Sequence, residues 1–316
     1  MAPVPDTDRR TPQGVRYSTV PHIVNSDGQY LYCRTWEPTL QAGQKLRALL
    51  FVSHGLGSHC GVLGPILAQL LNSHGFLVFG HDHVGHGESE GERVHVGDFG
   101  PLARDLIQHV DMMVAKYPGV PVFLFGHSIG GAVAFTASCQ RPGFFRGMVL
   151  SGPAIENSYT KADILRWTLL WTVAYIWPYK NIGPSRNAVL TKDTKKARKY
   201  AEDPLVYKGD YRLYSSCMVL YGMDRLRQDY AIKTGKGLLP TVDCPFLVLH
   251  GEDDEHCDIS GSWKLYEQAR SKDKEIKTYP NCRHVLLLET PEDVEKVKQD
   301  ILDWYLARVD PAESAT

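Results

Sequence analysis

The sequence predicts an α/β protein in which a mostly parallel sheet is covered by helices on both faces and carries one helical insertion. Short apolar strand segments alternate with helical patterns in the first half of the chain, and such alternation is typical of parallel sheets. The alternation stops over residues 154–236 and resumes near residue 245. The 316 residues, of which 43% are hydrophobic, are enough for one large domain of this kind.

The individual elements are expected where apolar runs are bounded by turn signals. Residues 17–37 alternate in polarity around Asn25-Ser26-Asp27-Gly28, which predicts two strands joined by a hairpin turn. Residues 1–15 are polar and proline-bearing, so we expect them to be disordered and the folded domain to span 16–316. Further strands are expected at 48–53, 76–80, 122–126, 148–151, 245–250 and 276–279, and helices at 61–74, 99–116 and 291–307.

The insertion over residues 154–236 has no clear strand pattern and is expected to form a helical cap. Such a cap would lie above the carboxyl ends of the strands, where open α/β sheets bind their ligands. Residues 164–178 are apolar on more than one face and include Trp167, Trp171 and Trp177. This helix either packs inside the cap or places its surplus apolar surface in a lipid interface, which indole rings favour.

A candidate nucleophile lies in Gly126-His127-Ser128-Ile129-Gly130, which fits the pattern G-x-S-x-G. An expected strand precedes it and a helix-compatible stretch follows, which is the context of a sharp turn that exposes a serine hydroxyl. Glycine is needed at 126 and 130 because side chains there would collide across the turn. The alternative is an ordinary glycine-rich turn, so the interpretation depends on partners for Ser128.

The partners are expected after the last two strands, because this architecture orders the residues as serine, acid, histidine. His284 follows the strand at 276–279 and is the candidate general base. The acid is Asp253, Asp254 or Asp258, which all follow the strand at 245–250. We favour Asp254, because a short loop after Gly251 can turn its side chain back toward the histidine; the other acids would face water or cap the next helix.

An oxyanion formed at the serine needs fixed N–H donors. One expected donor is the backbone N–H of Ile129, directly after the nucleophile. The other is the N–H of Leu56, in the turn His54-Gly55-Leu56-Gly57 after the strand at 48–53.

The remaining polar clusters are interpreted as structural. His81-Asp82-His83-Val84-Gly85-His86 is compatible with zinc, but no second cluster follows at a suitable spacing, so we expect a hydrogen-bonded loop beside the oxyanion turn and no metal or cofactor. The basic cluster 192–199 is expected to be a solvated helix face.

The bulk composition excludes several classes of protein. The formal net charge of −1 gives no general attraction to nucleic acid. Seven cysteines without a C-x-x-C pair indicate free thiols in a reducing compartment. Neither a secretory signal nor an apolar run of about 20 residues is present, so we expect a cytoplasmic protein that associates peripherally with membranes through its cap.

As a set, these residues resemble the monoacylglycerol lipases of the α/β-hydrolase fold. The likeness spans nearly the whole chain, and its most specific part is residues 81–91; it also includes residues 10–13, 24–31, 54–57 and Asp203-Pro204-Leu205. The resemblance implies hydrolysis of a monoacylglycerol to fatty acid and glycerol, with Ser128, Asp254 and His284 as catalytic residues. It implies reversible docking on membranes and no metal or organic cofactor.

The chain departs from this family where the family binds glycerol. The family usually has polar residues there, and the matching positions, which are the candidate substrate-binding residues, are Ser58, Val62 and Leu287. Loss of hydrogen-bonding partners weakens discrimination for the glycerol hydroxyls. A carboxylesterase or lysophospholipase with relaxed headgroup preference is therefore the first alternative. A catalytically silent scaffold is the second, although no member of the triad is missing.

Three cysteine positions of the family also bear on this chain. Cap positions that often carry cysteines are Tyr207 and Tyr214 here. Cys257 matches a cysteine near the family's active site, and it is either close to the chemistry or a buried inert thiol.

Overall fold

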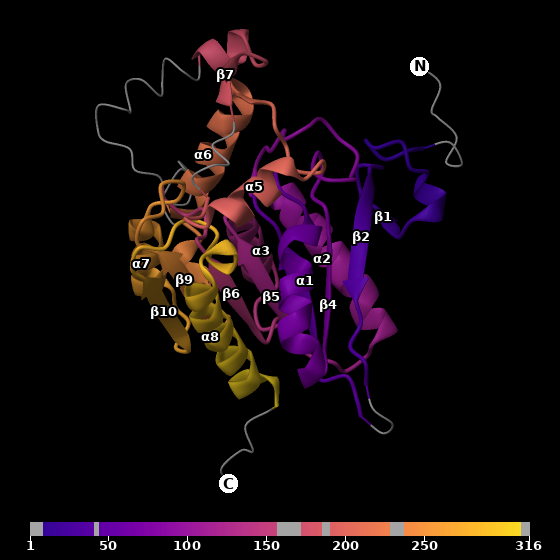
Figure 1. The fold of residues 1–316 in the computed structure, drawn as a ribbon, viewed down its shortest axis with the longest axis vertical. Coiled ribbons are helices and arrows are strands. Elements are labelled where there is room, and N and C mark those ends of the chain that lie inside the picture. Colours follow the sequence, from indigo (N-terminus) through magenta and orange to yellow (C-terminus); the bar gives the residue numbers. More distant parts are fainter. Residues whose placement is uncertain (1–8, 41–43, 157–171, 185–189, 228–236, 311–316) are drawn as a thin grey trace.

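The computed structural model of the chain describes residues 9–40, 44–156, 172–184, 190–227 and 237–310. Its centre is an eight-stranded sheet in the order β1-β2-β4-β3-β5-β6-β9-β10 (Figure 1). The six strands from β4 to β10 are mutually parallel, whereas β1 and β2 are antiparallel to their neighbours. The strands are β1 (His22–Val24), β2 (Tyr30–Trp36), β3 (Ala48–Ser53), β4 (Phe76–His81), β5 (Val122–His127), β6 (Gly147–Ser151), β9 (Phe246–Gly251) and β10 (Lys274–Tyr279).

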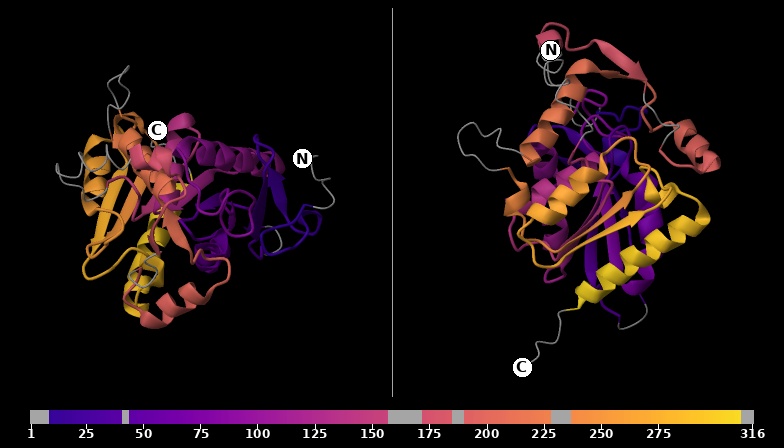
Figure 2. Two further views of the ribbon diagram at one scale, coloured as in Figure 1. Left: turned by 90° about the horizontal axis from the view of Figure 1, so that it is seen from above. Right: turned by 90° about the vertical axis from the view of Figure 1, so that its left-hand side faces the viewer.

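Helices cover both faces of the sheet (Figures 1 and 2). On one face lie α1 (Cys60–Leu71) and α8 (Pro291–Val309), and on the other α2 (Phe99–Lys116), α3 (Ile129–Gln140) and α7 (Ile259–Gln268). Short 3₁₀ turns occupy Tyr17–Thr19, Asn72–His74, Leu239–Thr241 and Leu286–Leu288.

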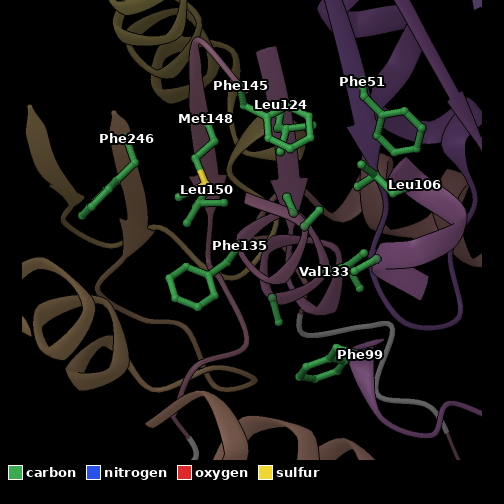
Figure 3. Packing of buried hydrophobic residues seen from close by; sticks show 14 of the residues in the cluster. Phe51, Phe99, Leu106, Leu124, Val133, Phe135, Phe145, Met148, Leu150 and Phe246 are labelled. Atoms are coloured by element: carbon green, nitrogen blue, oxygen red, sulfur yellow. The ribbon is translucent and has the colours of Figure 1, made fainter. Parts of the chain in front are cut away.

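Two buried apolar clusters fill the space between the sheet and its helices. Figure 3 shows the cluster on the α2 and α3 face, where Val133 and Phe135 of α3 pack with Leu124 of β5 and Leu150 of β6. Strands β3, β5, β6 and β9 are buried on both faces, which is why they read as continuous apolar runs in the sequence. The predicted mostly parallel sheet with flanking helices is confirmed.

The described part of the cap contains α5 (Thr194–Glu202), α6 (Leu213–Arg227) and a two-stranded sheet of β7 (Asn181–Pro184) and β8 (Asp210–Arg212). We expected no strand in the insertion, and this was wrong. Both strands are too short to show an alternating pattern in the sequence. Residues 172–176 are helical, whereas 157–171, which include most of the expected lipid-facing helix, lie outside the described residues.

The first described residues do not fit the expected disorder of 1–15. The Arg9 guanidinium donates to the carbonyl of Gly28 at 2.8 Å, and Arg10 and Arg16 form a β-bridge. Thr11 is buried. Residues 9–15 therefore form an ordered loop, and residues 1–8 lie outside the described part.

No helix in the described residues is both long enough and apolar enough to cross a lipid bilayer.

Candidate active site

Ser128 occupies a sharp turn between β5 and α3. Its backbone has φ 57° and ψ −124°, a region that non-glycine residues rarely adopt. The strained turn is held at both ends, because the Ser128 N–H donates to the carbonyl of Ser151 at 3.1 Å and the Ser128 carbonyl accepts from the N–H of Ala154 at 3.0 Å. A side chain at position 130 would collide with the carbonyl oxygen of Ser53, which explains the glycine there.

The loops after β9 and β10 bring an acid and a histidine together. The Nδ1–H of His284 donates to Oδ2 of Asp254 at 2.7 Å. The other carboxylate oxygen of Asp254 accepts from the N–H groups of His256 at 2.8 Å and Cys257 at 3.0 Å. Because both oxygens are held, the carboxylate fixes the orientation and tautomer of the His284 ring.

The two other candidate acids have different surroundings. Asp258 caps the N-terminus of α7, where its side chain accepts from the N–H of Ser260 at 2.8 Å. Asp253 precedes the pair, and its own N–H donates to the carbonyl of Cys282 at 2.9 Å. Among these acids it is Asp254 that contacts His284.

A second histidine, His250, lies behind the carboxylate and was missed by sequence reasoning. Its Nε2 is 3.2 Å from Oδ2 of Asp254, and its Nδ1 is 2.7 Å from the hydroxyl of Ser262. Burial raises the pKa of Asp254, but His284 and His250 outweigh burial and hold this pKa well below the usual range of aspartate. The only signal in the sequence is a polar residue near the carboxyl end of an otherwise apolar strand.

The turn after β3 lies against the serine. A Cβ on Gly55 would be 3.2 Å from Cβ of Ser128, so the two backbones approach closely. Leu56 and Ile129 line the same cavity as Ser128. Neither of their N–H groups donates to a main-chain carbonyl within the described part of the chain, so both can serve a ligand.

His54 fixes this turn to the histidine-bearing loop. Its Nδ1–H donates to the carbonyl of Gly55 at 2.9 Å, while its Nε2 accepts from the N–H of His83 at 2.9 Å. This pair of bonds requires a neutral ring. Burial lowers the pKa of His54 well below its usual value, in agreement with that requirement.

The loop from 81 to 91 is bound by hydrogen bonds throughout. Asp82 accepts from the N–H groups of Cys60 and Glu88, each at 2.9 Å. Nε2 of His83 is 3.1 Å from the hydroxyl of Ser53. Among the residues that the structure describes, no group of histidine, cysteine or acid side chains has an arrangement that could hold a metal ion.

A cavity of about 510 Å³ opens over Ser128 and His284. It reaches from the oxyanion turn to the cap, and Val219 and Met223 of α6 form part of its apolar wall. Of the candidate substrate-binding residues, Ser58 and Val62 line this cavity. Leu287 does not, because it is packed in the core below α8 and faces a separate cavity.

Several lining residues were not predicted from the sequence. Tyr200 of α5 is buried and its hydroxyl hydrogen-bonds the side chain of Ser58; burial raises the pKa of Tyr200 to about 12. Tyr211 lies on the same wall. The ring of His256 stacks on His284, with centroids 5.0 Å apart and planes at 18°. Each comes from a loop or cap segment, where spacing carries no signal.

Cys257 also lines the cavity, beside Ser128. Burial, together with the negative charge of Asp254, raises the pKa of its thiol well above the usual value. The side chain therefore stays a protonated thiol near neutral pH, which is the unreactive state.

A strained serine between strand and helix, an acid–histidine pair from the last two strand ends and a cap insertion define an α/β-hydrolase. Comparison with known proteins agrees with this class. A model of the serine aminopeptidase S33 family matches residues 44–291. Human monoglyceride lipase is 40% identical over 99% of both chains.

Solved structures extend the comparison. A monoacylglycerol lipase of Paleococcus ferrophilus has a TM-score of 0.69 and 27% identity, over 88% of this chain and 99% of its own. A soluble variant of monoglyceride lipase from Saccharomyces cerevisiae, in complex with a substrate analogue, superposes with a TM-score of 0.77 at 24% identity, over 98% and 100%. The chain belongs to the monoacylglycerol lipase family.

Proposed function

We propose that this protein is a serine ester hydrolase that cleaves a monoacylglycerol to free fatty acid and glycerol. The observation that carries the proposal is the His284–Asp254 hydrogen bond of 2.7 Å on the wall of the cavity that also holds Ser128 at its strained turn. The relatives named above, with their printed activity on monoacylglycerols, support the choice of substrate.

In the proposed mechanism the hydroxyl of Ser128 attacks the ester carbonyl. Asp254 binds Nδ1–H of His284, which leaves Nε2 of the ring to take the serine proton. The N–H groups of Leu56 and Ile129 bind the oxyanion, and one such bond contributes about 3 kcal/mol to lowering the barrier. His284 then protonates the leaving glycerol, and a water molecule activated by the same ring hydrolyses the acyl-enzyme.

The cavity gives the two halves of the substrate different surroundings. The apolar side chains of Leu63, Val219 and Met223 form a surface for the acyl chain. Near the oxyanion turn, the Ser58 hydroxyl is already bonded to Tyr200, and the neighbouring Val62 offers no hydrogen bond. This wall favours a site with little preference for glycerol over a simpler alcohol.

A substrate panel tests both the reaction and the headgroup preference. We expect fatty acid release from monoacylglycerol, with kcat/KM less than about a hundredfold above that for the methyl ester of the same fatty acid. A larger ratio would show that glycerol is read by groups other than Ser58 and Val62. No release from any of these esters would refute the proposed reaction.

We further propose that the cap docks on a membrane surface. Within the described part of the cap, Tyr175, Trp177 and Ile182 are 88%, 66% and 51% exposed. Lys180 lies over the ring of Trp177, so a cation accompanies the apolar surface where anionic headgroups would lie. Such exposed apolar patches are typical of membrane or protein contacts.

Sedimentation with anionic phospholipid vesicles tests the docking surface. Replacement Trp177→Ser is expected to weaken binding about tenfold, because a large aromatic side chain no longer enters the interface. The matched control is Trp263→Ser, which alters an exposed tryptophan on α7, away from the cap. Equal losses in both variants, or no loss in either, would contradict docking through this surface.

A further inference from the structure

A second cavity of about 460 Å³ lies beside the first, between α1, α5 and the start of α8. Both views in Figure 2 place α5 beside the first turns of α8, and Lys196 joins them by donating to the carbonyl of Glu289 at 2.6 Å. The floor of this cavity is apolar, formed by Val62, Pro65, Ile66, Leu287, Leu288 and Val294.

The edge of the cavity is cationic. Lys196 and Lys199 of α5 and Lys298 of α8 line it, together with one acid, Asp203. That acid faces Nε2 of His59 at 3.1 Å. The basic helix that the sequence presents as a solvated face therefore directs two of its lysines to a concave apolar surface.

The three lysines differ in how far they are already neutralised. Lys298 pairs with Glu295 at 2.9 Å, and Lys196 lies 3.9 Å from Asp193. Lys199 makes no ion pair with any residue that the structure describes. An apolar floor with an uncompensated cation at its edge matches a ligand with one alkyl chain and one anionic head.

The second cavity shares a wall with the first, because Val62 and Tyr200 line both. A hydrolase of the kind proposed above releases a single-chain carboxylate in the first cavity, directly behind that wall. We propose that the second cavity binds a long-chain fatty acid, with its chain on the floor and its carboxylate at Lys199. The site itself rests on the lining residues, and only the choice of ligand rests on the proposed function.

Equilibrium dialysis with a radiolabelled long-chain fatty acid, kept below its micellar concentration, tests this site on the full chain. We expect two bound equivalents, one in each cavity. Lys199→Glu is expected to weaken one of them about tenfold or more, because an attractive charge becomes repulsive. The matched control is Lys195→Glu, since Lys195 is exposed on the same helix but lines neither cavity.

Two further arms separate the site from its alternatives. The alcohol of the same chain length is expected to fill only the first cavity, because it has no carboxylate for Lys199. Ile66→Gln, which changes the floor of the second cavity alone, is expected to weaken the same equivalent as Lys199→Glu.

The proposal is overturned if Lys199→Glu and Lys195→Glu have equal effects, or if the alcohol binds at both sites as the acid does. It is also overturned if Lys199→Glu reduces binding to anionic vesicles and leaves the monomeric fatty acid unaffected, since the face would then be a membrane contact. Binding is measured without turnover, so failure here is distinguishable from failure of the proposed hydrolysis.

Discussion

At the scale of single residues, the chemistry depends on the tautomers of two buried imidazoles. His284 gives its Nδ1 proton to Asp254, and His54 gives its Nδ1 proton to the carbonyl of Gly55. The first leaves a base for the serine, and the second holds the turn that carries Leu56. Both orientations are set by partners from other segments, which is why the sequence identifies the histidines but not their hydrogen bonds.

The variant Asp254→Asn tests the first tautomer. An asparagine amide can donate to Nδ1 of His284 and so favour the wrong tautomer, and in an analogous serine hydrolase such a change lowers kcat by about 10⁴-fold. We expect a loss of that order in ester hydrolysis, with Asp253→Asn as the matched control that keeps its activity. A loss below about tenfold would show that Asp254 does not orient the base.

The same scale shows where prediction from sequence succeeds and where it stops. Ser128 and His284 could be predicted because each is tied to a local pattern or to the last strand end. Asp254 had to be chosen among three acids, and only the folded loop separates it from the helix cap Asp258. Leu287 was expected in the substrate cavity from a resemblance, but the turn at Leu286–Leu288 directs it into the core.

At the scale of elements, the turn between β5 and α3 depends on close backbone packing. Gly130→Ala would place a methyl group against the carbonyls of Ser53 and His54, and main-chain atoms of a central strand cannot move aside cheaply. We expect this variant to lower the free energy of unfolding by about 2 kcal/mol or more and to abolish hydrolysis.

The control for this prediction is Gly100→Ala in α2. A Cβ there would meet only the carboxyl group of Asp98, at ordinary van der Waals distance. Alanine also has the higher helix propensity, so the control should be neutral or slightly stabilising. Denaturant unfolding followed by circular dichroism compares the two, and equal stability of both variants would contradict close packing at position 130.

Elements with long apolar runs were predictable, because burial on both faces produces a strong sequence signal. The central strands and the helices around them follow that rule. In contrast, β7 and β8 are fixed by pairing with each other, and nothing local distinguishes them from loop. The cap therefore contributes the residues that reasoning from sequence missed, among them Tyr200 and Tyr211.

At the scale of the whole molecule, stability is coupled to a buried group of neutral histidines. Burial lowers the pKa of His86 and of His109 to about 4 in each case. Burial, reinforced by neighbouring histidines, lowers the pKa of His54, His81 and His83 well below the usual value. Near pH 6 the unfolded chain can bind protons at these positions that the folded chain cannot.

The sign of the pH dependence follows from that difference. Stability is complete above the unfolded pKa of about 6.5 and falls as the pH drops below it, because protons then favour the unfolded state. From about pH 7 to about pH 5.5, each of these histidines is expected to remove about 1 kcal/mol from the free energy of unfolding. Urea unfolding at constant ionic strength measures this, and an unchanged unfolding free energy over that interval would contradict the neutral buried group.

The overall arrangement joins the elements into one account of function. The sheet presents Ser128, Asp254 and His284 at its carboxyl edge, and the cap closes an apolar cavity above them. The exposed cap surface around Trp177 faces away from the core, where a lipid interface would deliver a single-chain ester. A second, cationic-edged cavity behind Tyr200 would receive the acid.

The central claim is that Ser128 carries the acyl group. The most direct measurement compares the rate of fatty acid release from a monoacylglycerol by the unaltered chain and by Ser128→Ala, with circular dichroism to verify that both are folded. We predict that the variant loses about 10⁴-fold or more of the rate. A folded Ser128→Ala variant that retains the rate within about tenfold would contradict the account.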